Sequence, residues 1–302
     1  MKHEIDLKNF NIHTDLVIED QSIKTKYNIE EYKDITVTKV IVNKENKNIL
    51  NRKEGTYITI EFNDVTDIDN QNNLEKVFIK YLEKLMKNID KSRGLIIGLG
   101  NSNSTPDSLG PNVIRDIVVT THLANITKLD NGFNEIAAFS PGVTGDTGIE
   151  TADIITNIIN TIKPNYVIIV DALASKSIER VNKTIQMSDA GISPGSGIGN
   201  NRKELSKDTL NIPVISIGIP TVVDAVSIVA DTINYMYNDK IKLINLKKYN
   251  DNEIREILFS VLTPLGYNLI VTPKEIDFII KKLSNILSNG INKVIHPKLK
   301  IK

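Results

Sequence analysis

The stretch from Leu95 to Ile114 constrains the fold of this chain more than any other. It begins with Leu95–Ile97, an apolar run of the kind found in a buried parallel strand, and then changes into a polar loop that contains glycines. Pro111 follows the loop, and because proline favours the first turn of a helix, the apolar pattern after it predicts a helix. The stretch therefore predicts a strand, a loop and a helix in succession.

The glycines of this loop do not complete a nucleotide-binding motif. Gly98 and Gly100 fit the first two positions of a G-x-G-x-x-G pattern, but Asn103 stands where the third glycine belongs. A phosphate-binding P-loop is also excluded, because no Gly-Lys-Ser or Gly-Lys-Thr follows. Asp107, near the end of the loop, has two interpretations. It caps the next helix, or it is a functional carboxylate at the carboxyl end of a strand, where ligands of parallel sheets bind.

Strand and helix patterns alternate along the residues that follow, which is typical of a parallel sheet. Short apolar or β-branched runs predict strands at 135–139, 166–170 and 214–217, and apolar residues at helical spacing predict helices at 149–162 and 222–237. We therefore expect an α/β fold with a mainly parallel central sheet and helices on both faces. The catalytic α/β core should cover residues 95–237.

The flanking residues predict smaller elements. Two runs rich in β-branched and aromatic residues, 35–42 and 57–62, predict paired strands and a β-rich section over residues 35–62. An amphipathic helix is expected over 74–89. Closing helices are expected at 251–260 and 274–289, within residues 251–302. Residues 238–252 are expected to form a linker, and residues 1–34 a polar arm.

The charge balance and the absence of cysteine exclude several classes of protein. The chain has 37 basic residues, counted as lysine plus arginine, and 37 acidic residues, counted as aspartate plus glutamate. It therefore has no net positive charge that would attract nucleic acid or an anionic membrane. Without cysteine the chain has no disulfide, thiolate zinc site or cysteine nucleophile. No uncharged apolar run reaches about 18 residues, and the amino terminus lacks the apolar region of a signal peptide. We expect a soluble, cytoplasmic protein that contacts neither membrane nor nucleic acid.

A second carboxylate, Asp171, follows the apolar run Tyr166–Val170, at a place that corresponds to the loop of Asp107. Because the carboxyl ends of parallel strands share one edge of a sheet, the two carboxylates are expected to converge there. Carboxylates that lie close together share a proton, so that one acts as an acid while the other acts as a base on a water molecule. The residues leave two alternatives open, a metal ion bound by the pair and two independent helix caps.

Two glycine-rich loops, 142–148 and 191–199, are candidates for lining a substrate path, because glycine lets the backbone approach a bound chain closely. The candidate contacts are Asn101, Thr144, Gly145, Gly195 and Gly197. The 4 histidines show no H-E-x-x-H spacing, and the chain has no G-x-S-x-G elbow. Zincin and serine-hydrolase mechanisms are therefore disfavoured.

Five segments together resemble the germination protease family of spore-forming bacteria. They are GLGNSNSTPDSLGP (98–111), FSPGVTGDTGIET (139–151), VIIVDALASKSIERV (167–181), DAGISPGSGIGNNRKELS (189–206) and IPVISIGIPTVVDA (212–225). The resemblance implies an atypical aspartic-type endopeptidase whose essential aspartates fall on Asp107 and Asp171, with a fold similar to that of hydrogenase maturation peptidases. It also implies small acid-soluble spore proteins as substrate, action in the forespore or spore core during germination, a homo-oligomer such as a tetramer, and no cofactor.

The same resemblance implies that the chain is made as an inactive zymogen. Thr14–Glu19, with the sequence TDLVIE, places an apolar run between two acidic residues, as the substrate sites of the family do. We therefore predict self-cleavage between Asp15 and Leu16, a propeptide of residues 1–15 and a peptidase domain of residues 16–302. The alternatives are a metal-assisted hydrolase of another substrate on the same scaffold and a catalytically idle module that binds peptides.

Overall fold

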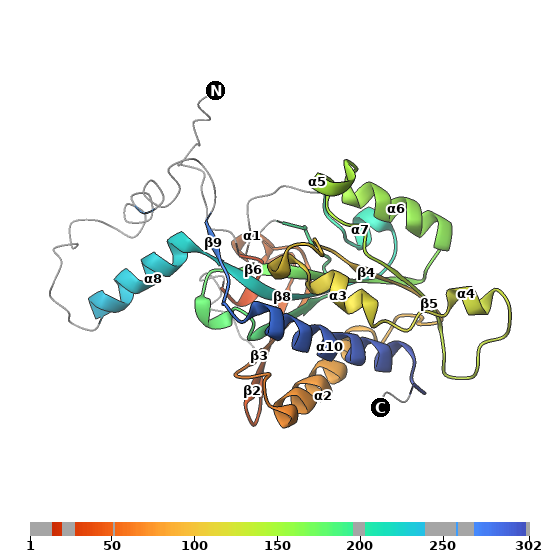
Figure 1. The fold of residues 1–302 in the computed structure, drawn as a ribbon, viewed down its shortest axis with the longest axis horizontal. Helices are drawn as coiled ribbons and strands as arrows, with labels where there is room; N and C mark the ends of the chain where they lie inside the picture. The colour runs from red at the N-terminus through yellow and green to blue at the C-terminus, as the bar shows by residue number, and fades with distance from the viewer. Residues whose placement is uncertain are drawn as a thin grey trace.

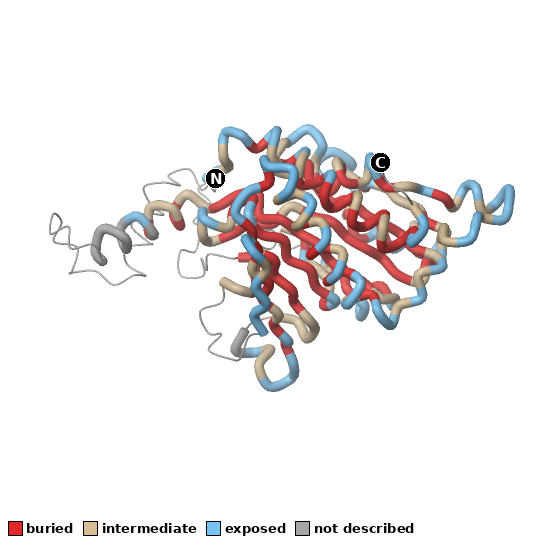
Figure 2. The backbone as a smooth tube through the Cα atoms, turned by 90° about the horizontal axis from the view of Figure 1, so that it is seen from below, coloured by how far each residue is buried: buried red, intermediate tan, exposed pale blue. Residues whose placement is uncertain are grey.

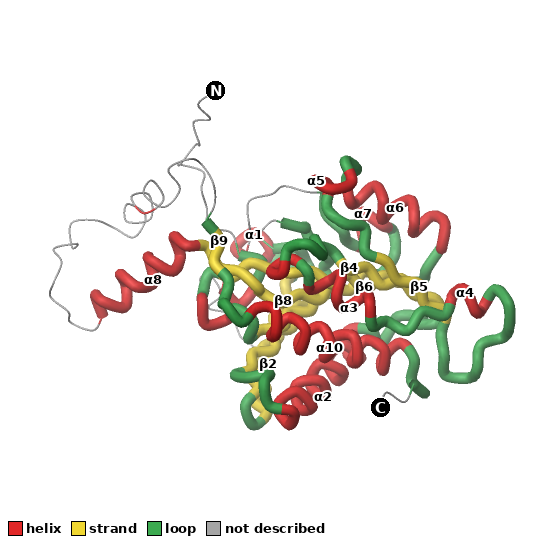
Figure 3. Tube along the Cα trace, viewed as in Figure 1, coloured by secondary structure: helices red, strands yellow, loops and turns green. Residues whose placement is uncertain are grey.

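The structure of the chain is a computed structural model that describes residues 14–19, 28–50, 52–195, 203–238, 258 and 269–299. Within these ranges, nine strands form one sheet with helices on both faces (Figures 1 and 3). The order across the sheet is β1 (Asn28–Tyr32), β2 (Ile35–Val42), β3 (Gly55–Phe62), β7 (Thr184–Ser188), β8 (Val214–Asp224), β6 (Tyr166–Ser175), β4 (Arg93–Gly98) and β5 (Glu135–Phe139), and β9 (Ile270–Val271) pairs with β8.

The strands β8, β6, β4 and β5 pair in parallel, whereas the other pairs are antiparallel. The predicted α/β fold, with a parallel centre and helices on both faces, is thereby confirmed. The β-rich section of residues 35–62 extends the same sheet, because β3 pairs with β7 and β7 pairs with β8. The sequence patterns missed β7, since this short strand carries the polar residues Gln186 and Ser188.

The two faces of the parallel strands bury different side chains, because successive residues of a strand point to opposite sides. On one face, Ile96 and Ile168 pack in the core formed with α2 (Ile68–Leu85), α3 (Leu109–Arg115) and α10 (Ile276–Ile295). On the other face, Leu95 and Val167 pack with α6 (Thr151–Ile162) and α7 (Lys207–Leu210). Figure 2 shows the strands buried between the helices. The continuous apolar runs of β4 and β6 follow from this burial on both faces.

The other helices are short or peripheral. They are α1 (Lys47–Leu50), α4 (Thr121–Ala124), α5 (Thr144–Thr147), α8 (Ala225–Asn238) and the single-turn helices η2 (Val17–Glu19), η3 (Thr105–Asp107) and η4 (Ile178–Arg180). The helix α8 extends away from the sheet (Figure 1). The closing helix predicted at 274–289 corresponds to α10, and the polar arm contains β1. The predicted helix at 251–260 and the linker at 238–252 lie outside the described residues, apart from positions 238 and 258.

Two predicted strand ends are wrong because the central strands are longer than their apolar runs. The strand β6 continues to Ser175 and β8 continues to Asp224, and the two stay paired along this length. The helix predicted over 222–237 therefore begins only at Ala225. Asp171 lies inside β6 rather than after its end. The carboxylate is consequently fixed by strand pairing and not by a loop.

Two helix starts also differ from the prediction. The helix α3 begins at Leu109, so that Pro111 lies within its first turn, where a missing N–H costs no hydrogen bond. The helix α2 begins at Ile68, before the apolar pattern that predicted it. Its start is set by Asp67, whose Oδ1 accepts a hydrogen bond from the Asn70 N–H (3.0 Å).

His296 lies fully buried at the end of α10 and joins this helix to the segments between α3 and β5. Its Nδ1 accepts a hydrogen bond from the Asn134 N–H (3.2 Å), and its Nε2 donates to the Val118 carbonyl oxygen (2.9 Å), as a neutral ring can. Burial lowers the pKa of His296 below its ordinary value of 6.5. The unfolded chain therefore binds the proton more readily. The free energy of unfolding should fall as the pH falls below about 6.5, by at most about 1.4 kcal/mol per pH unit from this group.

The substitution His296→Gln removes this titration. Denaturant unfolding at about pH 7.5 and about pH 5.5, on either side of the ordinary histidine pKa, should show a smaller acid-induced loss of stability for His296→Gln than for the wild type. The exposed His122 provides a matched control, and His122→Gln should keep the wild-type pH dependence. Equal pH dependence in wild type and His296→Gln would contradict the assignment.

Candidate active site

Asp107 lies in η3, and the loop that carries it closes back on the end of β4. The Asn101 N–H donates both to the Asp107 carbonyl oxygen (3.0 Å) and to its carboxylate Oδ2 (3.0 Å). Gly100 has φ +114°, and a Cβ at this position would lie 2.0 Å from the Asp107 carbonyl oxygen. Only glycine permits this approach. The predicted site residues Asn101 and Asp107 are therefore direct neighbours.

The same loop is joined to the strand that carries Asp171. The Leu99 N–H donates to the carbonyl oxygen of Val170 (2.8 Å), the residue before Asp171, and η3 packs against β6 and β8. The loop after β5 is tied to the same place, because the Ser140 Oγ donates to the Gly98 carbonyl oxygen (2.7 Å). The structure thus gathers the loops after β4 and β5 at the part of β6 where Asp171 lies.

The two predicted catalytic carboxylates differ in their surroundings. Asp171 is 6% exposed, and its backbone pairs with Gly218 of β8. Its Oδ1 accepts a hydrogen bond from the Ala172 N–H (2.9 Å). Asp107 is half-buried at the loop. Asp171 is thus the more buried of the two carboxylates.

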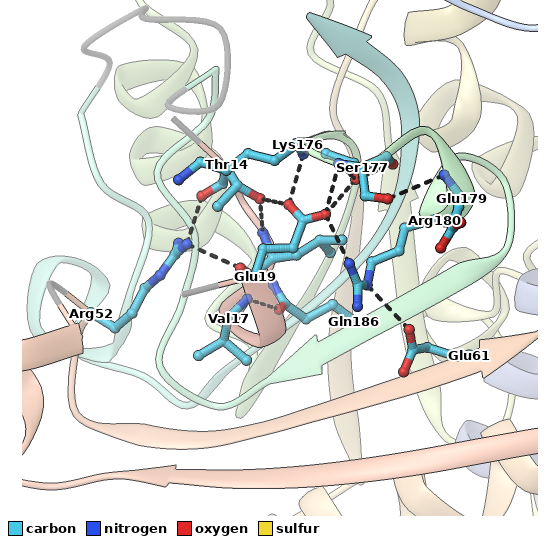
Figure 4. A network of polar contacts seen from close by, with 12 residues as sticks. Thr14, Val17, Glu19, Arg52, Glu61, Lys176, Ser177, Glu179, Arg180 and Gln186 are labelled. Carbon is cyan, nitrogen blue, oxygen red and sulfur yellow. Dashed lines mark hydrogen bonds and ion pairs between the residues drawn. The ribbon is translucent and has the colours of Figure 1, made fainter. Parts of the chain in front are cut away.

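Residues 14–19 dock on β6 beyond Asp171 (Figure 4). The Asp15 N–H donates to the Ala174 carbonyl oxygen (3.2 Å), and the Ala174 N–H donates to the Asp15 Oδ2 (2.9 Å). Leu16 and Val17 are each 0% exposed, and burial of such a side chain stabilises the docked segment by about 1.5–3 kcal/mol. Val17 packs in an apolar patch that also contains Val40, Val42, Tyr57 and Ala190. The predicted cleavage site is therefore a buried part of the structure.

Gln186 of β7 spans the predicted cleavage site. Its Nε2 donates to the Asp15 carbonyl oxygen (2.8 Å), and its Oε1 accepts a hydrogen bond from the Val17 N–H (2.7 Å). A donor at a carbonyl oxygen stabilises the negative charge that develops there when the carbonyl carbon is attacked. The sequence patterns did not single out Gln186. It lies in a short stretch of mixed polar and apolar residues, which offers no sequence signal for this role.

Arg52 supplies further donors to the same segment. Its Nη1 donates to the Asp15 carbonyl oxygen (3.4 Å), and its Nη2 donates to the carbonyl oxygens of Thr14 (2.6 Å) and Leu16 (3.2 Å), as Figure 4 shows in part. The planar guanidinium carries enough N–H groups to reach three successive carbonyls. Arg52 stands in a polar stretch that offers no sequence signal for such a role.

The remaining predicted substrate contacts are less closely connected to the aspartates. Thr144 begins α5 and is half-buried, and within the described part of the chain its Oγ1 is buried without a hydrogen-bond partner. Gly145 is exposed, and Gly195 is half-buried with φ +72°. Gly197 lies outside the described residues. Thr144 and Gly145 lie in α5, which follows the Ser140 contact with β4, and the role of all four residues stays a prediction.

Comparison with known proteins identifies the family. The family model described as Germination protease matches residues 10–244 and 238–302. The chain belongs to the germination protease family. The germination protease of Bacillus cereus (strain ATCC 10987 / NRS 248) is 38% identical over 357 residues, covering 99% of this chain and 97% of the relative. That of Oceanobacillus iheyensis is 42% identical over 352 residues, covering 97% and 96%. Membership places the chain among the proteases.

Among solved structures, the comparison matches a [NiFe] hydrogenase maturation protease, HycI from Thermococcus kodakarensis KOD1. It is 15% identical in sequence and has a TM-score of 0.36. The match covers 70% of this chain and 98% of that structure.

Two further features concern only the residues that the structure describes. No helix among them is long and apolar enough to cross a membrane. No three His, Cys, Asp or Glu side chains among them lie together in a way that could hold a metal ion.

Proposed function

We propose that the chain is the self-processing zymogen of an aspartic-type endopeptidase that degrades small acid-soluble spore proteins during germination, in the forespore or spore core. The position of the Asp15–Leu16 bond supports this proposal most. The segment around this bond is docked on the strand of Asp171, and the Asp15 carbonyl oxygen accepts hydrogen bonds from Gln186 and Arg52. A chain held in this way has the contacts of a substrate bound to its enzyme.

Asp107 and Asp171 supply the proton transfers in this proposal. The ionised carboxylate takes a proton from a water molecule, whose oxygen forms a bond to the carbonyl carbon of Asp15. The two donors at the carbonyl stabilise the resulting oxyanion. The protonated partner then gives its proton to the Leu16 nitrogen as the carbon–nitrogen bond breaks. One water is consumed, and the pair again holds one proton, so the cycle can repeat.

The docked segment also explains why an uncut chain would be inactive. Residues 14–19 fill the place beside β6 that another peptide would have to occupy. Cleavage would separate residues 1–15 from the peptidase domain, residues 16–302, and allow the segment to be displaced. We further propose that the mature enzyme is a homo-oligomer such as a tetramer, needs no cofactor, and contacts neither DNA nor membrane directly.

Incubation of the full chain at mildly acidic pH should yield a mature chain that begins at Leu16. Acid favours the reaction because one member of the carboxylate pair must carry a proton. Edman sequencing measures the new amino terminus. The Asp171→Asn chain should stay intact under the same conditions. A mature chain that begins elsewhere would reject the cleavage site, and unchanged processing of Asp171→Asn would show that another protease cuts the chain.

The processed protein is then incubated with a small acid-soluble spore protein, and the fragment masses are measured. Free substrate should be cut faster than DNA-bound substrate, because release from the duplex lets the chain enter the site. Equal rates would count against this expectation. Activity that EDTA abolishes and a divalent cation restores would favour the metal-assisted hydrolase. Binding without cleavage would favour the idle peptide-binding module.

A further inference from the structure

The sequence contains two Asn-Gly pairs, and the structure places them in opposite settings. Asn131–Gly132 lies in the turn between α4 and β5, whereas Asn289–Gly290 lies inside α10. In such a pair the glycine has no side chain that hinders access to its backbone nitrogen. This nitrogen can attack the side-chain carbonyl carbon of the asparagine before it. The backbone around each pair decides whether the attack takes place.

The turn at Asn131–Gly132 leaves the reacting groups accessible. The Phe133 N–H donates to the Asp130 carbonyl oxygen (3.1 Å), and Gly132 has φ +99°, the positive value that a type II turn requires at its third residue. Asn131 is exposed. Within the described part of the chain, neither the Asn131 side chain nor the Gly132 N–H has a hydrogen-bond partner. No contact therefore has to break before the two groups meet.

The helix protects the second pair. Gly290 lies within α10, where α-helical geometry bonds its N–H to the carbonyl oxygen of Ile286, four residues earlier. Gly290 is buried, and a Cβ at this position would lie 2.5 Å from a ring carbon of Phe78 in α2. Its nitrogen can reach the Asn289 side chain only if this turn of α10 opens. Opening disrupts the packing of α10 against α2, so the reactive state is rare.

We propose that Asn131 is a site of spontaneous deamidation in the folded protein and that Asn289 is protected from it. The Gly132 nitrogen forms a bond to the side-chain carbonyl carbon of Asn131, and the amide nitrogen leaves as ammonia together with the proton that the Gly132 nitrogen gives up. The succinimide ring that results then takes up one water molecule. Opening at one of its carbonyls gives aspartate, and opening at the other gives isoaspartate. Both products carry a negative charge where asparagine was neutral.

Isoaspartate changes a segment that is fixed immediately after the turn. The Asn134 N–H donates to His296 Nδ1 (3.2 Å), its Nδ2 donates to the Ile295 carbonyl oxygen (2.6 Å), and the Phe133 and His296 ring centroids lie 5.3 Å apart. Isoaspartate adds one carbon to the main chain just before these contacts. The turn must then change shape, which strains the contacts between the loop and the end of α10. Deamidation should therefore lower the free energy of unfolding.

Peptide mapping of the folded full-length chain after long incubation at mildly alkaline pH tests the proposal. The peptide that contains Asn131 should gain the mass expected when an amide becomes a carboxylate, and an isoaspartate form should elute separately. Asn289 in the same sample is the internal control, and it should react at least about tenfold more slowly, because its helix must open first. In a chain unfolded by denaturant, both pairs should react at similar rates, because neither is then protected.

The variant Asn131→Gln gives a second control. Its longer side chain disfavours ring closure, so the peptide should keep its mass. Denaturant unfolding then compares fresh and aged samples, and the midpoint should fall on ageing in the wild type but not in Asn131→Gln. Both asparagines lie within residues 16–302, so the result does not depend on self-processing.

The outcomes decide each part of the proposal. An unmodified Asn131 in the folded chain, or equal rates at Asn131 and Asn289, would overturn the site. A modified Asn131 with an unchanged unfolding midpoint would support the site and overturn the strain on the His296 contacts. Equal loss of stability on ageing in wild type and Asn131→Gln would likewise assign that loss to another cause.

Discussion

Asp171→Asn protein should process itself and cleave peptides about 10²–10⁴-fold more slowly than the wild type. Asparagine has nearly the same shape as aspartate, and its side-chain oxygen can still accept the hydrogen bond from the Ala172 N–H (2.9 Å). The fold should therefore stay intact, which thermal unfolding measures. The amide cannot accept and return a proton, so only the chemical step is lost. The rate of appearance of the Leu16 amino terminus gives the effect.

Asp107→Asn should have an effect of the same order, because the proposed mechanism makes the two carboxylates share one proton-transfer cycle. The double variant should then be little slower than either single variant, as is usual for residues that act as a unit. The exposed Asp116 provides the matched control, and Asp116→Asn should process at the wild-type rate. Wild-type activity in Asp107→Asn or in Asp171→Asn would show that the pair is not catalytic.

Gln186→Met should slow self-processing by about 10²–10³-fold, the loss typical of removing one donor to a developing oxyanion. Methionine is of similar length and apolar, but it cannot donate to the Asp15 carbonyl oxygen as Gln186 Nε2 does at 2.8 Å. It also leaves the Val17 N–H without its present acceptor. Timed mass analysis of the chain at mildly acidic pH measures the rate.

A second glutamine separates this effect from the general loss of a side-chain amide that is bonded to the backbone. Gln71 Nε2 donates to the Val65 carbonyl oxygen (2.8 Å), a similar bond to backbone at the start of α2, remote in the chain from the cleavage site. Gln71→Met should therefore process at the wild-type rate. If Gln186→Met does the same, the contact with Asp15 plays no part in the reaction.

The stretch around Asp107 shows how far local sequence determines this fold. Its apolar run, its glycines and Pro111 predicted a strand, a loop and a helix, and each depends on neighbours in the chain. The full lengths of β6 and β8 could not be predicted in this way, because their later residues are fixed by pairing with each other. The position of Asp171 inside β6 therefore became visible only in the structure.

The groups that hold the predicted cleavage site depend even more on packing between distant segments. Gln186 is 171 residues from Asp15 in the chain, and Arg52 is 37 residues from it. No local pattern specifies such pairs. The acidic and apolar pattern of residues 14–19 predicted a cleavage site, but it contained no information about the side chains that bind this segment.

The burial of Val17 bears on how long an activated molecule would last. In the uncut chain this side chain shields apolar groups on β2 and β3 from water. If the proposed cleavage displaces residues 16–19, that shielding would be lost, at a cost of about 1.5–3 kcal/mol, until an apolar residue of a substrate restored it. The mature enzyme would thus be more prone to aggregation and to its own proteolysis whenever it is idle. The lifetime of the mature enzyme would therefore be limited by the supply of the protein that it digests.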